Sequence, residues 1–446
     1  MTALTPLDGR YANRIGELVP YLSEDALIRY RVYAEVEWLI YVLRTTKKPL
    51  TLSNERALRA YVKSFAATDA EEIRRIETAT SHDVKAVELW LGSRCSTPAL
   101  KVVVPYIHIG RTSEDINNIA YACMLRDCLK NVILPETSNL ISLLQDLAHN
   151  SSSAAMLART HGQPASPTTF GKEVAVFVSR LQTQLSHIAD VKIYAKCNGA
   201  TGTFAADLIA FPGIDWPDAM ETFITSLGLG YQPLTTQIEP HDWIARMCNE
   251  LGLMSTICIG LCRDFWHYIS LGYLSQRIIE GEVGSSTMPH KVNPIDFENA
   301  EANFGVGMAL FRHLAEKLPI SRLQRDLSDS SALRSLSEAL GHYFLATKSL
   351  KKGLAKVYPN AEVMRADLAD EWSIVTEAIQ TIMRKNGIHD AYDQLKSISR
   401  GKTITKQALH NFISGLAIDG SDKERLLNLT PETYIGYAAE LSAKLR

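Results

Sequence analysis

Apolar residues along this chain recur mostly at steps of three and four, which is the spacing of one face of a helix. The longest series runs without a break from Ile244 to Tyr268, and a second covers Val174 to Ile188. We expect further helices at about 114–148, 296–317 and 330–356. Long helices with a narrow apolar seam pack nearly antiparallel, so the pattern predicts a long helical bundle.

Stretches that favour a sheet are few. The best candidate strand is Lys101–Ile107 (KVVVPYI), although the proline inside it weakens the prediction. Pro135 is expected to kink or break the helical range in which it lies. Polar linkers that contain Gly or Pro are expected near 92–113, 157–168, 198–240 and 281–295.

We therefore predict a mainly α fold in three parts. An N-terminal helical domain covers 1–111, a central long-helix bundle covers 112–357, and a small helical domain covers 358–446. The last part is set apart by shorter helices and many charges. Long apolar seams also leave faces on which copies of the chain could assemble.

Composition excludes several classes of protein. The net charge is −2 over 446 residues, so no overall field attracts nucleic acid or an anionic membrane. Seven cysteines form no CxxC pair and lack the histidine spacing of a zinc site, so we expect buried thiols and no metal. No apolar run reaches 18 residues and the first ten residues do not resemble a signal peptide, so we expect no membrane span and a cytoplasmic protein.

The first candidate for chemistry is the segment Gly284–Pro294 (GSSTMPHKVNP). A serine is a weak base or nucleophile unless neighbouring donors stabilise its alkoxide. Gly-rich backbone offers such N–H groups, and Lys291 offers a positive charge. By residue types and spacing alone, a reactive loop and a flexible surface loop are equally good interpretations.

Three further polar segments and a set of arginines stand out. His161 is expected where a loop enters a helix, although a single histidine is more often structural. Ser81-His82-Asp83 is the next segment. Thr112-Ser113-Glu114-Asp115 is typical of a helix N-cap, and such an N-terminus also binds carboxylates. Arginines that could bind anions lie near the start and around the serines at 328–331: Arg10, Arg322, Arg325 and Arg334.

The motif Gly284-Ser-Ser-Thr-Met-Pro-His-Lys-Val-Asn-Pro294 resembles the signature of the fumarase/aspartase superfamily. That resemblance implies a long helical bundle, a homotetramer with sites shared between subunits, and elimination of fumarate. Within the superfamily the chain is similar to a bacterial branch that acts on purine nucleotides. The supporting stretches are Asp8–Tyr11, Ser81–Glu88, Thr112–Asn118, Arg159–Pro164, Thr235–Asp242 and Arg322–Arg334.

This second resemblance implies the reaction and its participants. Adenylosuccinate is expected to give AMP and fumarate, and the succinyl-carboxamide ribotide SAICAR to give AICAR and fumarate. It implies His161 as general acid, Ser285 as general base and Glu298 as the carboxylate that orients His161. It also implies that His82 helps to place the substrate. The implied substrate contacts are Arg10, Tyr11, Ser81, Asp83, Thr112, Ser113, Gln237, Ser286, Lys291, Asn293, Asn299, Arg325, Ser330, Ser331 and Arg334.

The reaction explains these residue types. Removal of a proton beside a carboxylate creates a dianionic intermediate, which Lys291 and converging N–H and hydroxyl donors stabilise. The departing nitrogen needs an acid with a pKa near 7, which suits histidine. No cofactor or metal is required. Ser81 and Gly110-Arg111 depart from the usual pattern, where Asn and small or thiol residues respectively are commoner.

Two alternatives stay open. One is another fumarate-releasing lyase of the superfamily, such as one that cleaves argininosuccinate. Small dicarboxylates need no set of arginines for a phosphate, so Arg10, Arg325 and Arg334 favour a nucleotide. The other is a non-catalytic helical scaffold. The presence of both His161 and Ser285 argues against it, because a scaffold needs neither.

Overall fold

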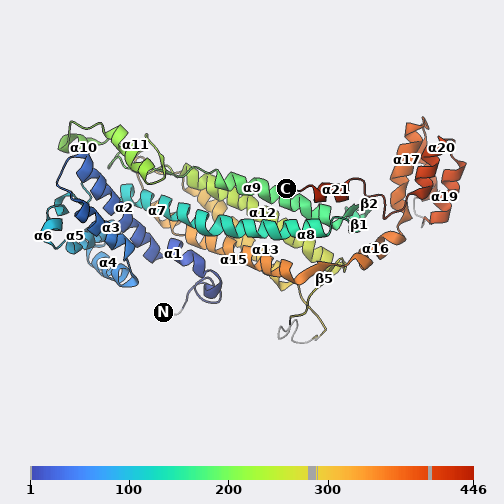
Figure 1. Cartoon of the computed structure of the whole chain (residues 1–446), viewed down its shortest axis with the longest axis horizontal. Helices are drawn as coiled ribbons and strands as arrows, with labels where there is room; N and C mark the ends of the chain where they lie inside the picture. The colour runs from blue at the N-terminus through green and yellow to red at the C-terminus, as the bar shows by residue number, and fades with distance from the viewer. Residues whose placement is uncertain (1–2, 280–287, 289, 400–403, 446) are drawn as a thin grey trace. The chain divides into compact units, whose positions relative to one another are not determined.

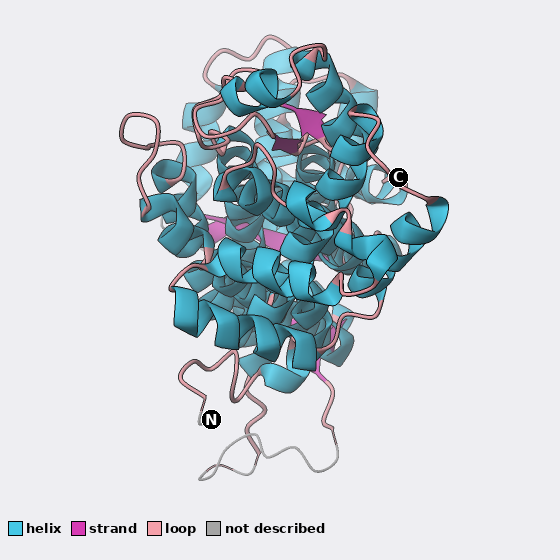
Figure 2. Ribbon diagram, turned by 90° about the vertical axis from the view of Figure 1, so that its left-hand side faces the viewer, coloured by secondary structure: helices cyan, strands magenta, loops and turns pink. Residues whose placement is uncertain are grey.

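We analysed a computed structural model of the whole chain; the structure describes residues 3–279, 288, 290–399 and 404–445. The described residues are mainly helical with only short strands, which confirms the predicted fold class (Figure 2). The chain divides into two compact units. Unit 1 comprises Met1–Thr137, Gln184–Thr256 and Asn303–Ala346, and unit 2 comprises Ser138–Thr183, Ile257–Ala302 and Thr347–Arg446. The predicted boundaries near 111 and 358 stay a prediction.

Long helices dominate the middle of the chain and follow the apolar periodicity. Their ranges extend over both units: α8 (Leu134–Asn150), α9 (Phe170–Ala189), α12 (Asp242–Ser270), α13 (Ile295–Lys317) and α15 (Leu336–Lys356). Figure 1 labels these helices. All five were predicted, α12 as the unbroken series from Ile244 and α8 as the end of the range at 114–148.

Pro135 lies at the second position of α8, directly after a π-helical turn at Leu129–Ile133. Proline has no N–H to donate to the preceding turn, and its ring clashes with the carbonyl four residues earlier. A wider turn relieves that clash. The chain therefore stays helical from α7 (Ser113–Cys128) into α8, with the irregularity at the expected place.

Unit 1 has a helical core built around α2 (Glu24–Thr45). Ser23 caps this helix through a hydrogen bond from Ala26 N–H. Its apolar face packs with the buried side chains of the next helices, including Leu58, Ile73 and Trp90. These helices are α3 (Leu52–Lys63), α4 (Ala67–Thr80) and α5 (Asp83–Arg94).

The remaining elements of unit 1 are short. They are α1 (Val19–Leu22), α6 (Pro98–Lys101), α10 (Ala205–Ala210), α11 (Trp216–Ser226), α14 (Ser328–Leu333) and the parallel pair β3 (Tyr194–Ala195) and β4 (Gly230–Tyr231). Single 3-10 turns cover Ala12–Arg14, Gly16–Leu18 and Val104–Tyr106.

The strand predicted at Lys101–Ile107 is wrong. Lys101 ends α6, and Val104–Tyr106 is a 3-10 turn with Pro105 in its first positions. Proline cannot donate a ladder hydrogen bond, but its fixed φ suits the first turn of a helix. Burial of Val103 in the helical core satisfies the apolar run without a sheet.

Unit 2 contains the hairpin of β1 (Ala155–Thr160) and β2 (Gln163–Thr169), and a second antiparallel pair, β5 (Leu274–Gln276) with β6 (Val357–Pro359). Its C-terminal helices bury a separate apolar core that includes Leu368, Ile379 and Leu409. These helices are α16 (Ala361–Ala369), α17 (Thr376–Lys385), α18 (Ala391–Ser399), α19 (Lys406–Gly415), α20 (Gly420–Asn428) and α21 (Ala438–Ala443), with a 3-10 turn at Trp372–Val375.

By length and composition, α12 is the one described helix that could cross a membrane, and 61% of its most apolar window is buried inside the protein. A core helix of a bundle passes the same test. The seven cysteines are free and buried, as their apolar surroundings predicted.

Candidate active site

The described candidate residues divide between the two units. Unit 1 holds the segments around His82, Thr112, Gln237 and Arg325, together with Arg10 and Tyr11. Unit 2 holds His161, Lys291, Asn293, Glu298 and Asn299. Ser285 and Ser286 lie outside the described residues, so their predicted roles stay predictions.

His82 begins α5 as its N-cap. Its Nδ1 accepts a hydrogen bond from Lys85 N–H at 3.2 Å, which leaves Nε2 as the protonated nitrogen of the neutral ring. Nε2 lies 3.5 Å from Ser113 Oγ, in the first turn of α7. The fold thus brings together two candidates that lie 31 residues apart, and both side chains remain accessible to a ligand.

Asp83 helps to hold the start of α5 next to α7, through Arg31 of α2. Arg31 donates to Asp83 Oδ2 at 2.6 Å and to Asn117 Oδ1 of α7 at 2.8 Å. Partial burial alone raises the pKa of Asp83, but the Arg31 guanidinium and the Val84 N–H more than compensate and lower it. Asp83 is therefore an ion-pair partner of Arg31 in this chain, and Arg31 is a residue that sequence reasoning missed.

Ser81 adopts a left-handed conformation, with φ 54° at the end of α4. Asparagine tolerates this region better than serine because its side chain can hydrogen-bond locally. The departure from asparagine noted in the sequence therefore falls at a backbone position that serine occupies under strain.

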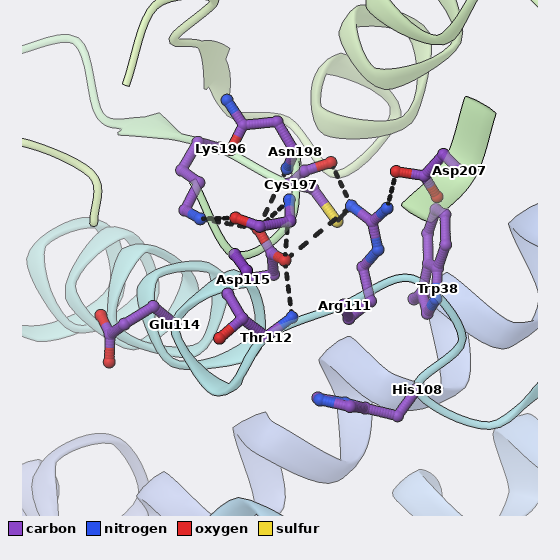
Figure 3. Close-up of polar contacts among 12 residues, drawn as sticks. Trp38, His108, Arg111, Thr112, Glu114, Asp115, Lys196, Cys197, Asn198 and Asp207 are labelled. Atoms are coloured by element: carbon purple, nitrogen blue, oxygen red, sulfur yellow. Dashed lines mark hydrogen bonds and ion pairs between the residues drawn. The ribbon is translucent and has the colours of Figure 1, made fainter. Parts of the chain in front are cut away.

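Thr112 is the N-cap of α7 and so takes one of the two positions, Thr112 or Ser113, that the sequence offered for it. Asp115 Oδ2 accepts a hydrogen bond from Thr112 N–H at 2.9 Å, which is one half of a capping box. Asp115 Oδ1 also accepts from Asn198 N–H at 3.0 Å and pairs with Lys196 Nζ at 2.9 Å (Figure 3). This buried carboxylate fixes the N-terminus of α7 to the segment at 196–199.

The structure explains the other departure from the family pattern, Gly110-Arg111, through the position of Arg111. Its guanidinium is buried, donates to Asp207 and to the carbonyl of Cys197, and lies 4.3 Å from the ring of Trp38 (Figure 3). Gly110 has φ +69°, and a Cβ there would lie 2.5 Å from Asp207 Oδ1. Gly110 and Arg111 are thus structural residues that pack in the core next to Thr112, and the buried Arg111 side chain is not accessible to a ligand.

The segment at 322–334 meets α7 through Arg325. Its NH1 lies 3.0 Å from Glu114 Oε1, and its NH2 donates to Ser330 Oγ at 3.1 Å. Gln237 N–H donates to the carbonyl of Gln324 at 3.3 Å, so Gln237 belongs to the same region. Ser331 follows in α14 and is exposed.

Arg334 and Arg10 are accessible cations of unit 1. Arg334 NH1 donates to Glu24 Oε1 at 2.5 Å, and both side chains are largely exposed. Arg10 lies over the ring of Tyr11, at 5.9 Å from its centre. Among its described residues, unit 1 therefore carries accessible candidates for ligand contact, namely His82, Ser113, Arg10 and Arg334.

His161 lies at the tip of the β1–β2 hairpin, so its predicted position at the entry to a helix is wrong. Thr160 pairs with Gln163, and both residues of the turn have positive φ, 53° at His161 and 75° at Gly162. Positive φ at both central residues is the mark of a type I′ hairpin turn. His161 is exposed there and makes no hydrogen bond or ion pair with the described residues of its own chain.

The predicted contact between Glu298 and His161 does not form within this chain. Glu298, on α13, instead accepts a hydrogen bond from Trp266 Nε1 of α12 at 3.2 Å. Asn299 accepts from Ser349 Oγ at 2.7 Å, while Lys291 is exposed and Asn293 is half-buried. The contact stays a prediction for an assembly of subunits.

Solved structures show the class of fold. The chain is similar to a fumarate lyase from Mesorhizobium sp. BNC1, with 21% identity, 97% of each chain covered and a TM-score of 0.78. It is also similar to the 3-carboxy-cis,cis-muconate lactonizing enzyme from Pseudomonas putida, with 19% identity, 96% of each chain covered and a TM-score of 0.75. The fold is thus that of the fumarate lyase class.

Sequence comparison gives the family. A lyase model matches residues 31–306, and an adenylosuccinate lyase C-terminal model matches residues 321–435. The adenylosuccinate lyase of Vibrio cholerae is 46% identical over 100% of this chain and 99% of its own length. That of Escherichia coli (strain K12) is 43% identical over the same shares. The chain belongs to the adenylosuccinate lyase family.

Proposed function

We propose that this chain eliminates fumarate from adenylosuccinate, giving AMP, and from SAICAR, giving AICAR. The observation that carries the proposal is the full-length similarity to adenylosuccinate lyases, at 46% identity to the protein from Vibrio cholerae. The accessible candidates of unit 1 (His82, Ser113, Arg10 and Arg334) agree with it, because a nucleotide substrate brings a phosphate and two carboxylates that need cations and hydroxyl donors.

The reaction divides into two proton transfers. Ser285, as its alkoxide, takes the proton from the carbon beside a succinyl carboxylate, and the negative charge spreads into that carboxylate. The C–N bond then breaks, its electron pair goes to the departing nitrogen, and His161 protonates that nitrogen. A positioned acid or base of this kind typically contributes about 10²–10⁴ in rate.

Several groups are suited to hold the dianionic intermediate. Lys291, which follows the proposed base by six residues in the sequence, brings a positive charge, and Ser286 brings a hydroxyl. Thr112 and Ser113 lie in the first turn of α7, where free N–H groups and the helix dipole favour a carboxylate. Stabilisation of charge as it develops is usually the largest contribution to such catalysis.

We further propose a homotetramer in which different subunits contribute to each site. Within one chain His161 is an exposed hairpin tip with no hydrogen bond or ion pair to the described residues, and Glu298 contacts Trp266. A hairpin tip reaches outward, so a neighbouring copy can receive His161. A cytoplasmic location is part of the proposal, since a reducing compartment suits seven free thiols.

The test is direct turnover. Pure protein is incubated with adenylosuccinate while near-ultraviolet absorbance is followed, and fumarate and AMP are identified as products. Argininosuccinate is the comparison substrate. Turnover of argininosuccinate without any change in adenylosuccinate would overturn the choice of substrate.

A pair of variants tests the residue roles against a non-catalytic scaffold. His161→Asn keeps a residue that tolerates positive φ, so the hairpin is preserved. Ser285→Ala removes only a hydroxyl. We expect each variant to lower kcat by about 10²-fold or more while AMP still binds. Near wild-type turnover by both would show the assignment to be wrong.

A further inference from the structure

A buried group of charges surrounds His241, just before α12. The group, called the His241 cluster below, consists of Glu114, Glu239, His241, Arg325 and Asp329. His241, Glu239, Asp329 and Glu114 are each only 2% exposed. Three carboxylates thus share one enclosed region with a single arginine, and enclosed carboxylates need compensating charge.

The ring of His241 lies between two of these carboxylates. Nε2 is 3.3 Å from Asp329 Oδ2, and Nδ1 is 3.6 Å from Glu239 Oε2. A neutral imidazole would present one lone pair to a carboxylate, whereas an imidazolium donates on both sides. Burial alone lowers the pKa of His241, but Asp329 and Glu239 overcome this effect and raise it to about 9.

The two carboxylates come from different segments of the candidate site. Glu239 follows Gln237 by two residues, and its Oε2 also accepts the His241 N–H at 2.8 Å. This bond holds His241 in its left-handed conformation, with φ 62°. Asp329 belongs to α14 and its Oδ1 accepts the Ser330 N–H at 2.7 Å. The imidazole therefore joins the segment of Gln237 to the segment of Ser330.

Arg325 extends the cluster to α7. It lies 4.0 Å from Asp329 Oδ2 on one side and 3.0 Å from Glu114 Oε1 on the other, and it donates to Ser330 Oγ. Asp329 thus lies beside Arg325 and holds the Ser330 N–H, so its position affects where the Arg325 guanidinium and the Ser330 hydroxyl lie. Both are proposed substrate contacts.

We propose that His241, as an imidazolium, is a positioning residue for the substrate. It links the Gln237 segment to α14, so that Gln237, Arg325 and Ser330 are held in position to contact the same ligand. It does not touch the substrate itself, since it is enclosed. The inference rests on the proposed function, because its readout is the handling of adenylosuccinate.

The test variant is His241→Asn. Asparagine tolerates the left-handed backbone but is too short to bridge Glu239 and Asp329. We expect KM for adenylosuccinate to rise about tenfold or more, equivalent to one order of magnitude in affinity, while kcat changes less than about threefold. A merely structural histidine would lower Tm and leave KM unchanged in the folded protein.

A double variant keeps the test valid if the single variant folds poorly. His241→Asn combined with Asp329→Asn removes the surplus buried carboxylate, so stability recovers while the link between the segments stays broken. KM should remain raised. His187→Asn is the matched control, since His187 is an exposed histidine 3.8 Å from Glu250 in the same unit, and its KM should equal that of the wild type.

The outcomes separate the two proposals. Wild-type turnover with unchanged KM in both His241 variants overturns the positioning role alone. Absence of adenylosuccinate turnover by the wild type removes the proposed function, and the positioning role falls with it.

Discussion

Arg111 and Asp207 form an ion pair in the core of unit 1, directly behind the N-cap of α7. Both side chains are enclosed, and the guanidinium also lies against Trp38. Burial raises the pKa of Asp207 even though Arg111 opposes this effect. Each of the two buried charges therefore depends on the other for compensation.

The first prediction concerns this pair. Arg111→Met should lower the free energy of unfolding by about 3–5 kcal/mol, because it leaves the Asp207 carboxylate enclosed without a partner. Combining it with Asp207→Leu should recover most of the loss. Denaturant unfolding of the two variants measures both effects. Asp207→Leu alone completes the cycle. A double variant that loses as much free energy as the two single variants together would show that the two residues are not coupled.

The second prediction concerns backbone strain at Ser81. Ser81→Gly should raise the free energy of unfolding by up to about 1 kcal/mol, because glycine adopts φ 54° without a steric penalty. Thermal unfolding gives the answer, with Ser93→Gly inside α5 as a control that should destabilise. A lower Tm for Ser81→Gly would mean that the serine side chain outweighs the strain.

The third prediction separates the two roles of His82. His82→Asn retains an N-cap side chain for α5, so Tm should stay within a few degrees of the wild type. Loss of the imidazole next to Ser113 should raise KM for adenylosuccinate about tenfold. Steady-state kinetics and thermal unfolding together test this. An unchanged KM with a lower Tm would show that His82 acts only as the N-cap of α5.

The fourth prediction is a pH dependence. The pKa of His241 is raised from 6.5 to about 9 on folding, so its protonated form stabilises the native state fully below about pH 6.5, and this contribution is lost as pH rises through 9. The groups that face it are Glu239, Asp329, Glu114 and Arg325. The stability difference between wild type and His241→Asn should shrink over this range, by about 3 kcal/mol at most. A difference that is constant with pH would contradict a protonated His241.

The fifth prediction concerns Arg325. Arg325→Met should raise KM for adenylosuccinate and for SAICAR by similar factors of about 10 or more, since both substrates carry a phosphate. Arg322→Met is the control, because Arg322 is largely exposed and pairs with the neighbouring Asp326. Kinetics on both substrates decide the matter, and a rise confined to one substrate would place Arg325 at another part of the ligand.

The sequence by itself determined the helices of the bundle, because an apolar step of three and four over many turns has few other solutions. It also predicted an N-cap at Thr112 or Ser113 and the irregular helix near Pro135. It misplaced Val103 and its neighbours, since a short apolar run suits a buried turn as well as a strand. It missed the hairpin at His161, although His-Gly between two polar stretches is compatible with a type I′ turn.

Tertiary structure alone decided which polar residues meet. His82 and Ser113 lie close together because α5 and α7 both pack against α2. Arg31, on the mostly apolar helix α2, joins α5 to α7 through its bonds to Asp83 and Asn117. The sequence did not distinguish His241 from the other polar residues of its motif. Only the folded structure shows that its ring is enclosed between Glu239 and Asp329. Local periodicity fixes an element, but the environment of a charge depends on segments far apart in the chain, and that environment sets its role.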